Sequence, residues 1–178
     1  MEYLIGRTVN RLRDGISTRI FEFNPGIDPD ISELEMNEAI RGQRAELLDS
    51  LEALAPKGIS GRINEQAAFT DATDQYLDEK ANDLWEIINM KYAEYMSPEL
   101  VSALIDLHTC LRDASAHIRQ YRKAERFPES GAHYKAIGRR GMAVCLHQII
   151  GQLNWLKRQG HSEAASLVAE PAAGSARA

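Results

Sequence analysis

A long apolar repeat in the region 97–124 constrains the fold more than any other feature of this sequence. Its members follow one another at alternating steps of four and three: Leu100, Leu104, Leu107, Leu111, Ala114, Ile118 and Tyr121. This spacing places them on one narrow stripe, the pattern of a helix packed lengthwise against other helices. We therefore expect a core helix over 98–125, with Ser97 as its N-cap and Pro98 at its first position.

The same periodicity predicts four further helices, at 2–20, 31–55, 62–96 and 132–159. The first half of the 31–55 helix has few apolar residues, so we expect it to project from the bundle. Pro56, Gly58 and Gly61 are predicted to end that helix. The stretch 62–96 has no Pro or Gly, and we read it as one long helix with a kink near Thr70 to Thr73.

These elements predict an all-α fold, a mainly antiparallel bundle of about five helices. The bundle forms a single domain over 1–169, which ends in a short helix over 162–169, and a disordered tail follows over 170–178. Gly138, Gly141 and Gly151 each cost the last helix about 1 kcal/mol relative to Ala. We expect this cost to mark close contacts between helices.

Composition favours a cytoplasmic protein without a metal or cofactor. Cys110 and Cys145 belong to no metal-binding or disulfide pattern, so we expect reduced thiols in the core. No apolar run approaches the roughly 18 residues of a membrane span. The helix 2–20 is basic and amphipathic and could lie on an anionic membrane surface. Its apolar stripe lacks Trp and Phe, which favours docking on the bundle instead.

Charge is divided along the chain, although the net charge is only −5. Residues 28–106 carry 18 acidic and 6 basic side chains, whereas residues 111–140 carry 3 acidic and 8 basic ones. The basic segment could form an open surface for anionic partners, or the acidic helices could neutralise it. The candidate nucleic-acid-binding residues are Arg119, Arg122, Lys123, Arg126, Arg139 and Arg140, with Tyr121, Phe127 and Tyr134 available for stacking.

One short motif carries a chemical signature. Arg112, Asp113 and His117 resemble the Arg, polar residue, three residues, His motif of the HEPN superfamily. Members of that family are compact helical bundles, often dimeric, and many are metal-independent ribonucleases. The resemblance implies that His117 acts as general acid or base, Arg112 stabilises charge on the phosphoryl group, and Asp113 orients one of them. The family's usual Tyr two residues after the His is absent, because Arg119 stands there.

Two functions remain open from the sequence. The first is a non-enzymatic helical interaction or regulatory protein that associates with itself as a homodimer or binds another protein, because the helical seams are longer than one short bundle needs. The alternative is a HEPN-like ribonuclease that acts on RNA.

Overall fold

The computed structural model describes residues 2–23, 26, 29–90 and 93–161, and every regular element in these ranges is helical. The elements are α1 (Glu2–Arg19), α2 (Glu33–Glu52), α3 (Pro56–Ser60), α4 (Glu65–Ala68), α5 (Asp71–Asn89), the 3₁₀ turn η1 (Ala93–Tyr95), α6 (Pro98–Arg126), the 3₁₀ turn η2 (Pro128–Ser130) and α7 (Gly131–Arg158). The predicted all-α class is confirmed.

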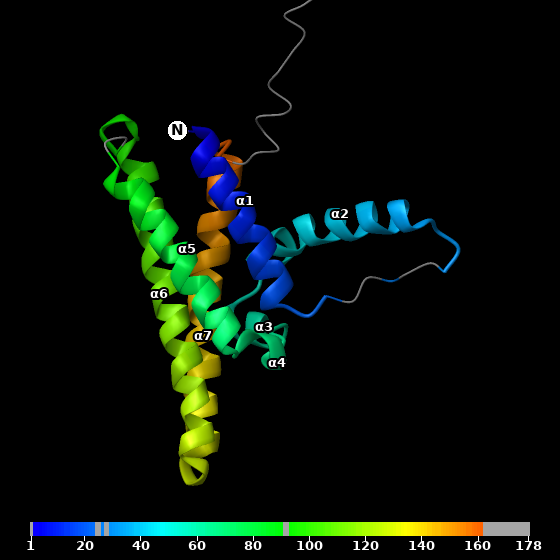
Figure 1. The fold of residues 1–178 in the computed structure, drawn as a ribbon, viewed down its shortest axis with the longest axis vertical. Helices are drawn as coiled ribbons and strands as arrows, with labels where there is room; N and C mark the ends of the chain where they lie inside the picture. The colour runs from blue at the N-terminus through cyan, green and yellow to red at the C-terminus, as the bar shows by residue number, and fades with distance from the viewer. Residues whose placement is uncertain (1, 24–25, 27–28, 91–92, 162–178) are drawn as a thin grey trace, which may run out of the picture.

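The longest helices form an antiparallel bundle. In Figure 1, α5, α6 and α7 alternate in direction, and α1 packs beside α5 and α7. The hairpin of α6 and α7 reaches past the other helices at the lower end of the molecule. We call this lower end, residues 119–140, the hairpin tip.

The predicted seams form the core. Leu107 and Leu111 of α6 and Leu146 of α7 have no solvent exposure. The stripe of α1 is buried as well, and its members are Ile5, Val9, Leu12, Ile16 and Ile20. These five residues of α1 therefore pack on the bundle and are not accessible to a membrane surface. In the part of the chain that is described, no helix has the length and apolar character needed to span a bilayer.

The prediction of one helix over 62–96 is wrong. The chain forms α4, leaves helical geometry at Phe69, and restarts at Thr70, whose hydroxyl accepts a hydrogen bond from Thr73 N–H as the N-cap of α5. The two threonine hydroxyls also donate to the carbonyl of Ala67. Local bonding by Thr70 and Thr73 thus replaces the expected kink with a break. The helix also ends early, at Asn89, and Tyr95 near the end of the predicted range is 77% exposed.

Two smaller expectations also differ from the structure or lie beyond it. Pro56 does not simply end a helix, because it begins the short helix α3, which buries Ile59. This follows from proline's suitability for the first helical turn. The predicted helix 162–169 and tail 170–178 lie outside the described residues.

Helix α2 projects from the bundle, as the sequence predicts (Figure 1). It begins with a capping box between Ser32 and Glu35, and Leu34 in its first turn is 70% exposed. Only its second half enters the core, through Leu48 and Leu51. The contacts of the second half therefore fix the position of the projecting first half.

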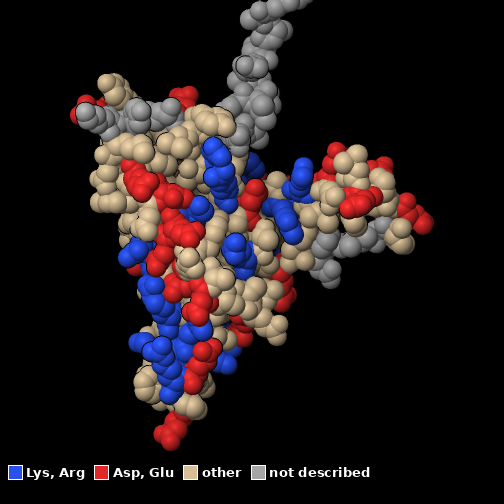
Figure 2. Space-filling view, viewed as in Figure 1, with Lys and Arg blue, Asp and Glu red and all other residues tan. Residues whose placement is uncertain are grey.

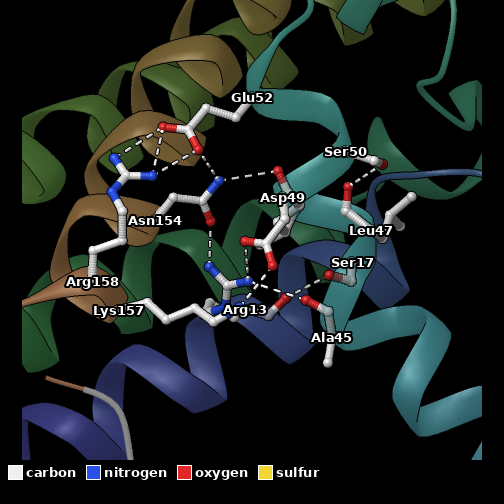
Figure 3. A network of polar contacts seen from close by, with 11 residues as sticks. Arg13, Ser17, Ala45, Leu47, Asp49, Ser50, Glu52, Asn154, Lys157 and Arg158 are labelled. Atoms are coloured by element: carbon white, nitrogen blue, oxygen red, sulfur yellow. Dashed lines mark hydrogen bonds and ion pairs between the residues drawn. The ribbon is translucent and has the colours of Figure 1, made fainter. Parts of the chain in front are cut away.

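A polar network holds that second half against α1 and α7 (Figure 3). Arg13 of α1 is 7% exposed, and its guanidinium donates to Asn154 Oδ1, to the carbonyl of Ala45 at 3.1 Å and to Asp49 at 3.3 Å. Asn154 in turn donates to the carbonyl of Leu48 at 3.1 Å and to the carboxylate of Glu52 at 3.0 Å. Each buried polar group in this network therefore has a partner.

The rim of the network is ionic. Lys157 pairs with Asp49 at 2.7 Å, and Arg158 pairs with Glu52 at 2.9 Å. Partial burial alone would raise the pKa of Asp49, but the Lys157 and Arg13 cations outweigh it and hold that pKa below its usual value. Hydrogen bonds from Arg158, and from Asn154 as well, lower the pKa of Glu52. Both carboxylates thus stabilise the fold in their ionised form.

Candidate functional site

The three residues of the HEPN-like motif lie on α6 but contact different neighbours. Arg112 pairs with Asp78 of α5 at 3.3 Å. His117 packs on α7, because a methyl group added at Gly141 would lie 2.1 Å from His117 Cε1. Asp113 is exposed and makes no hydrogen bond or ion pair within the described ranges. One chain therefore does not bring Arg112 and His117 to a common point.

Half of the candidate nucleic-acid-binding cations are occupied by carboxylates. Arg119 pairs with Asp74 at 3.1 Å and with Asp78 at 3.4 Å. Arg122 contacts Asp71, and Arg139 contacts Glu65. These pairs join α6 and α7 to α4 and α5, so the acidic helices neutralise this part of the basic segment.

The other three cations lie in the hairpin tip as well, and Figure 2 shows Lys and Arg side chains gathered at this end of the molecule with some Asp and Glu beside them. Lys123, Arg126 and Arg140 are exposed and have no ion pair among the described residues. Phe127 is 54% exposed, and its ring lies 5.9 Å from that of Tyr134. Lys123 Nζ lies 6.0 Å from the centre of the same Tyr134 ring. The tip thus offers unpaired positive charge next to aromatic surface.

A second stripe runs along α7 on the side away from the buried seam, and two of its members, Gly141 and Gln148, lie against His117 and Cys110 of α6. Its members follow at steps of four and three: Ile137, Gly141, Val144, Gln148, Gly151 and Trp155. Ile137 is 39% exposed, Val144 is 44% exposed and Trp155 is half-buried. We call these residues the outer α7 stripe. Its heptad-like spacing is typical of a helix that packs against another helix.

The glycines of α7 distinguish the two faces. At Gly138 an added methyl group would lie 2.6 Å from Tyr121 Cβ, and at Gly141 it would meet His117, so the predicted close contacts are confirmed there. At Gly151 no atom lies within 4 Å of the added group, so that part of the prediction is wrong within one chain. Gly151 instead leaves open space within an exposed stripe.

Beside the stripe, the other end of the hairpin is acidic. A groove of about 520 Å³ lies between α6 and α7, and Glu99, Asp106 and Trp155 are among the residues that line it. Both carboxylates are exposed and have no ion pair within the described ranges. The nearby cations Lys157 and Arg158 are already paired with α2. The groove between α6 and α7 is therefore acidic at this end, whereas Lys123 and Arg126 at the tip line a different pocket, beside Asp71 and Asp74 of α5.

Sequence reasoning does not identify this face, although its signal is present in the sequence. The steps of the outer α7 stripe can be read from the chain, but two glycines and a glutamine interrupt its apolar character. The sequence prediction assigns all three glycines of the helix to close contacts between helices. The structure distinguishes the two faces of α7, because Val144 is exposed and no atom lies within 4 Å of a methyl group added at Gly151.

The remaining candidate chemistry is confined to the core. Cys110 and Cys145 are buried, and burial raises their thiol pKa values to about 11 and about 12, so both thiols stay protonated. In the described ranges, no three His, Cys, Asp or Glu side chains are placed to hold a metal ion together. No protein-family model, curated protein or solved structure matches this chain.

Proposed function

We propose that this protein is a helical interaction protein that associates with a second copy of itself through the outer face of α6 and α7. The observation that carries the proposal is the outer α7 stripe, where Ile137 and Val144 are exposed at helix-packing spacing. Residues at this spacing lie on one side of a helix, where a second helix can pack against them.

The length of the hairpin supports a second copy as the partner. Helices α6 and α7 reach past the other helices of the bundle (Figure 1), and long helical seams of this kind favour contacts between helices of two chains.

Light scattering on two matched variants tests this function. Val144→Glu places a charge in the middle of the stripe and should convert the dimer to a monomer at micromolar concentration. Leu34→Glu changes a still more exposed apolar residue on α2 and should leave the dimer intact. A monomeric wild-type protein, or a Val144→Glu protein that dimerises as tightly as wild type, would refute the proposal.

The HEPN-like ribonuclease remains the alternative, and RNA binding at the tip belongs to it. A phosphate site would require Arg112 to leave Asp78 and meet a His117 side chain that faces α7. The deciding assay is RNA cleavage in EDTA by wild type and by the double variant Arg112→Ala/His117→Ala. Cleavage that only the wild type performs would establish the nuclease.

A further inference from the structure

We infer that the projecting half of α2 in one copy docks against the hairpin tip of a second copy. We call residues 33–40, which form this half, the arm, and we call the contact the arm–tip contact. It goes beyond the proposed function, because it joins two different surfaces and can repeat from copy to copy. Three features support it: the charges of the arm and the tip, their exposed apolar side chains, and their separation within one chain.

The arm is acidic. It carries Glu33, Glu35 and Glu38 and no Lys or Arg. The carboxylates of Glu33 and Glu38 are exposed and make no hydrogen bond or ion pair within the described ranges. Glu35 accepts hydrogen bonds from the Ser32 hydroxyl and backbone N–H, which lower its pKa and keep it ionised. Figure 2 shows Asp and Glu side chains at the free end of α2.

The hairpin tip supplies the opposite charge. Four of its cations have no carboxylate partner among the described residues, and they are Lys123, Arg126, Lys135 and Arg140. Only one tip carboxylate, Glu129, is likewise unpaired in that part of the chain. The pocket beside Lys123 and Arg126 contains three more carboxylates, each already paired with another arginine of α6. These carboxylates are Asp71, Asp74 and Glu125.

Both surfaces also expose an apolar side chain beside these charges. Leu34 of the arm is 70% exposed, and Glu38 lies one helical turn after it. Phe127 of the tip is 54% exposed, and Lys123 lies one turn before it. An arm that lies on the tip would set Leu34 against Phe127 and surround this apolar contact with pairs of opposite charge. An apolar centre with a polar rim is the usual composition of a protein interface.

The arm and the tip do not meet within one chain. In Figure 1, α2 leaves the bundle sideways, whereas the tip lies at the lower end of the molecule. Burial of Leu48 and Leu51 and the hydrogen bonds of Arg13 hold α2 in this direction. Each chain therefore carries an acidic and a basic surface that remain open to other molecules. This complementarity favours a second copy as the occupant of both.

Light scattering in a Val144→Glu background tests the arm–tip contact without the outer α7 stripe. At high micromolar concentration the average mass should exceed 19.9 kDa in about 20 mM salt and return to it in about 500 mM salt, because salt screens exposed charges. A monomer in low salt would overturn the inference.

Charge reversal in the same background tests which surfaces meet. Glu33→Lys/Glu38→Lys and Lys123→Glu/Arg126→Glu should each weaken association about tenfold or more, because each sets like charges together. Mixing the two variants should restore association, since the reversed arm then meets the reversed tip. The matched control Glu94→Lys/Glu99→Lys changes two exposed carboxylates elsewhere and should have little effect. An equal loss in the control, or no recovery on mixing, would overturn the arm–tip contact.

The outcomes separate the two proposals. If wild type is a dimer but the Val144→Glu protein stays monomeric in low salt, the arm–tip contact is wrong and the proposed function stands. If wild type and the Val144→Glu protein associate equally and both charge reversals abolish this association, the arm–tip contact stands and the proposed function fails.

Discussion

The inner and outer faces of α7 carry the same kind of spacing but opposite degrees of burial. On the inner face Leu146, Ile149 and Leu153 are fully buried against the other helices of the bundle. On the outer face Ile137 and Val144 are exposed, and glycine opens the surface at Gly151. The residues of the inner seam are covered by other helices of the same chain, whereas Ile137 and Val144 of the outer stripe stay partly exposed. The comparison teaches that helical periodicity identifies a face that can pack against another helix. Only burial shows whether that face already packs within the same chain.

The largest effect should come from the inner face. Leu146→Asp places an unpaired charge in the core and should abolish cooperative unfolding. Val144→Asp, two residues earlier, should keep a cooperative thermal transition, because Val144 is exposed in a single chain. Circular dichroism melts of the two variants check this pair. A sharp transition in the Leu146→Asp protein would show that the core lies elsewhere.

The next largest effect should come from the polar network through which Asn154 of α7 contacts α2. Asn154→Ala would leave the guanidinium of Arg13 and the carbonyl of Leu48 without the hydrogen bonds that Asn154 makes to them. We expect a loss of about 1–3 kcal/mol in the free energy of unfolding. Urea denaturation measures it, with Gln152→Ala as the control on the same helix. Equal stability of the Asn154→Ala protein and its control would show that the network contributes nothing.

The network also predicts a dependence on acid. The pKa values of Asp49 and Glu52 are lowered in the fold, so their stabilising effect is present above their ordinary values, about 3.8 and 4.5, and is lost as pH falls through the lower folded values. Asp49→Asn should therefore destabilise the protein at pH 7 and have a progressively smaller effect below about pH 4. Urea denaturation of wild type and variant across this range provides the comparison. A difference that grows as the pH falls would contradict the assignment.

The exposed ion pairs of α5 and α6 should matter least. Arg119→Ala removes contacts with Asp74 and Asp78, but the Arg119 side chain is 50% exposed. Exposed pairs typically contribute less than about 1 kcal/mol, so we expect a change within that limit. Urea denaturation in low and high salt measures the contribution. A loss as large as that of Asn154→Ala would mean that these pairs hold the bundle together.

Sequence reasoning predicts the helices whose stripes have regular spacing and bulky residues. The seams of α1, α6 and α7 follow from it, and so does the projecting start of α2, because one apolar face per helix can be read directly. The break at Thr70 is harder to predict, because side-chain hydroxyls compete with the helix only when local geometry favours them. The Arg13 network cannot be predicted, since no local pattern tells which arginine will be buried beside an asparagine 141 residues away.

The candidate site is harder to predict for a related reason. The basic segment is visible in the sequence, but which cations are paired depends on how α5 packs against α6. Arg119, Arg122, Lys123 and Arg126 all line one pocket beside Asp71 and Asp74, yet only the first two form ion pairs with these carboxylates. The sequence contains the outer α7 stripe, yet three glycines in one helix do not reveal which of them face a neighbour. Tertiary packing decides both questions.

The most direct test of the account is sedimentation velocity of the wild-type chain from low to high micromolar concentration. We predict a shift from a 19.9 kDa monomer to a species of twice that mass. A single monomeric boundary at every concentration and salt would contradict it.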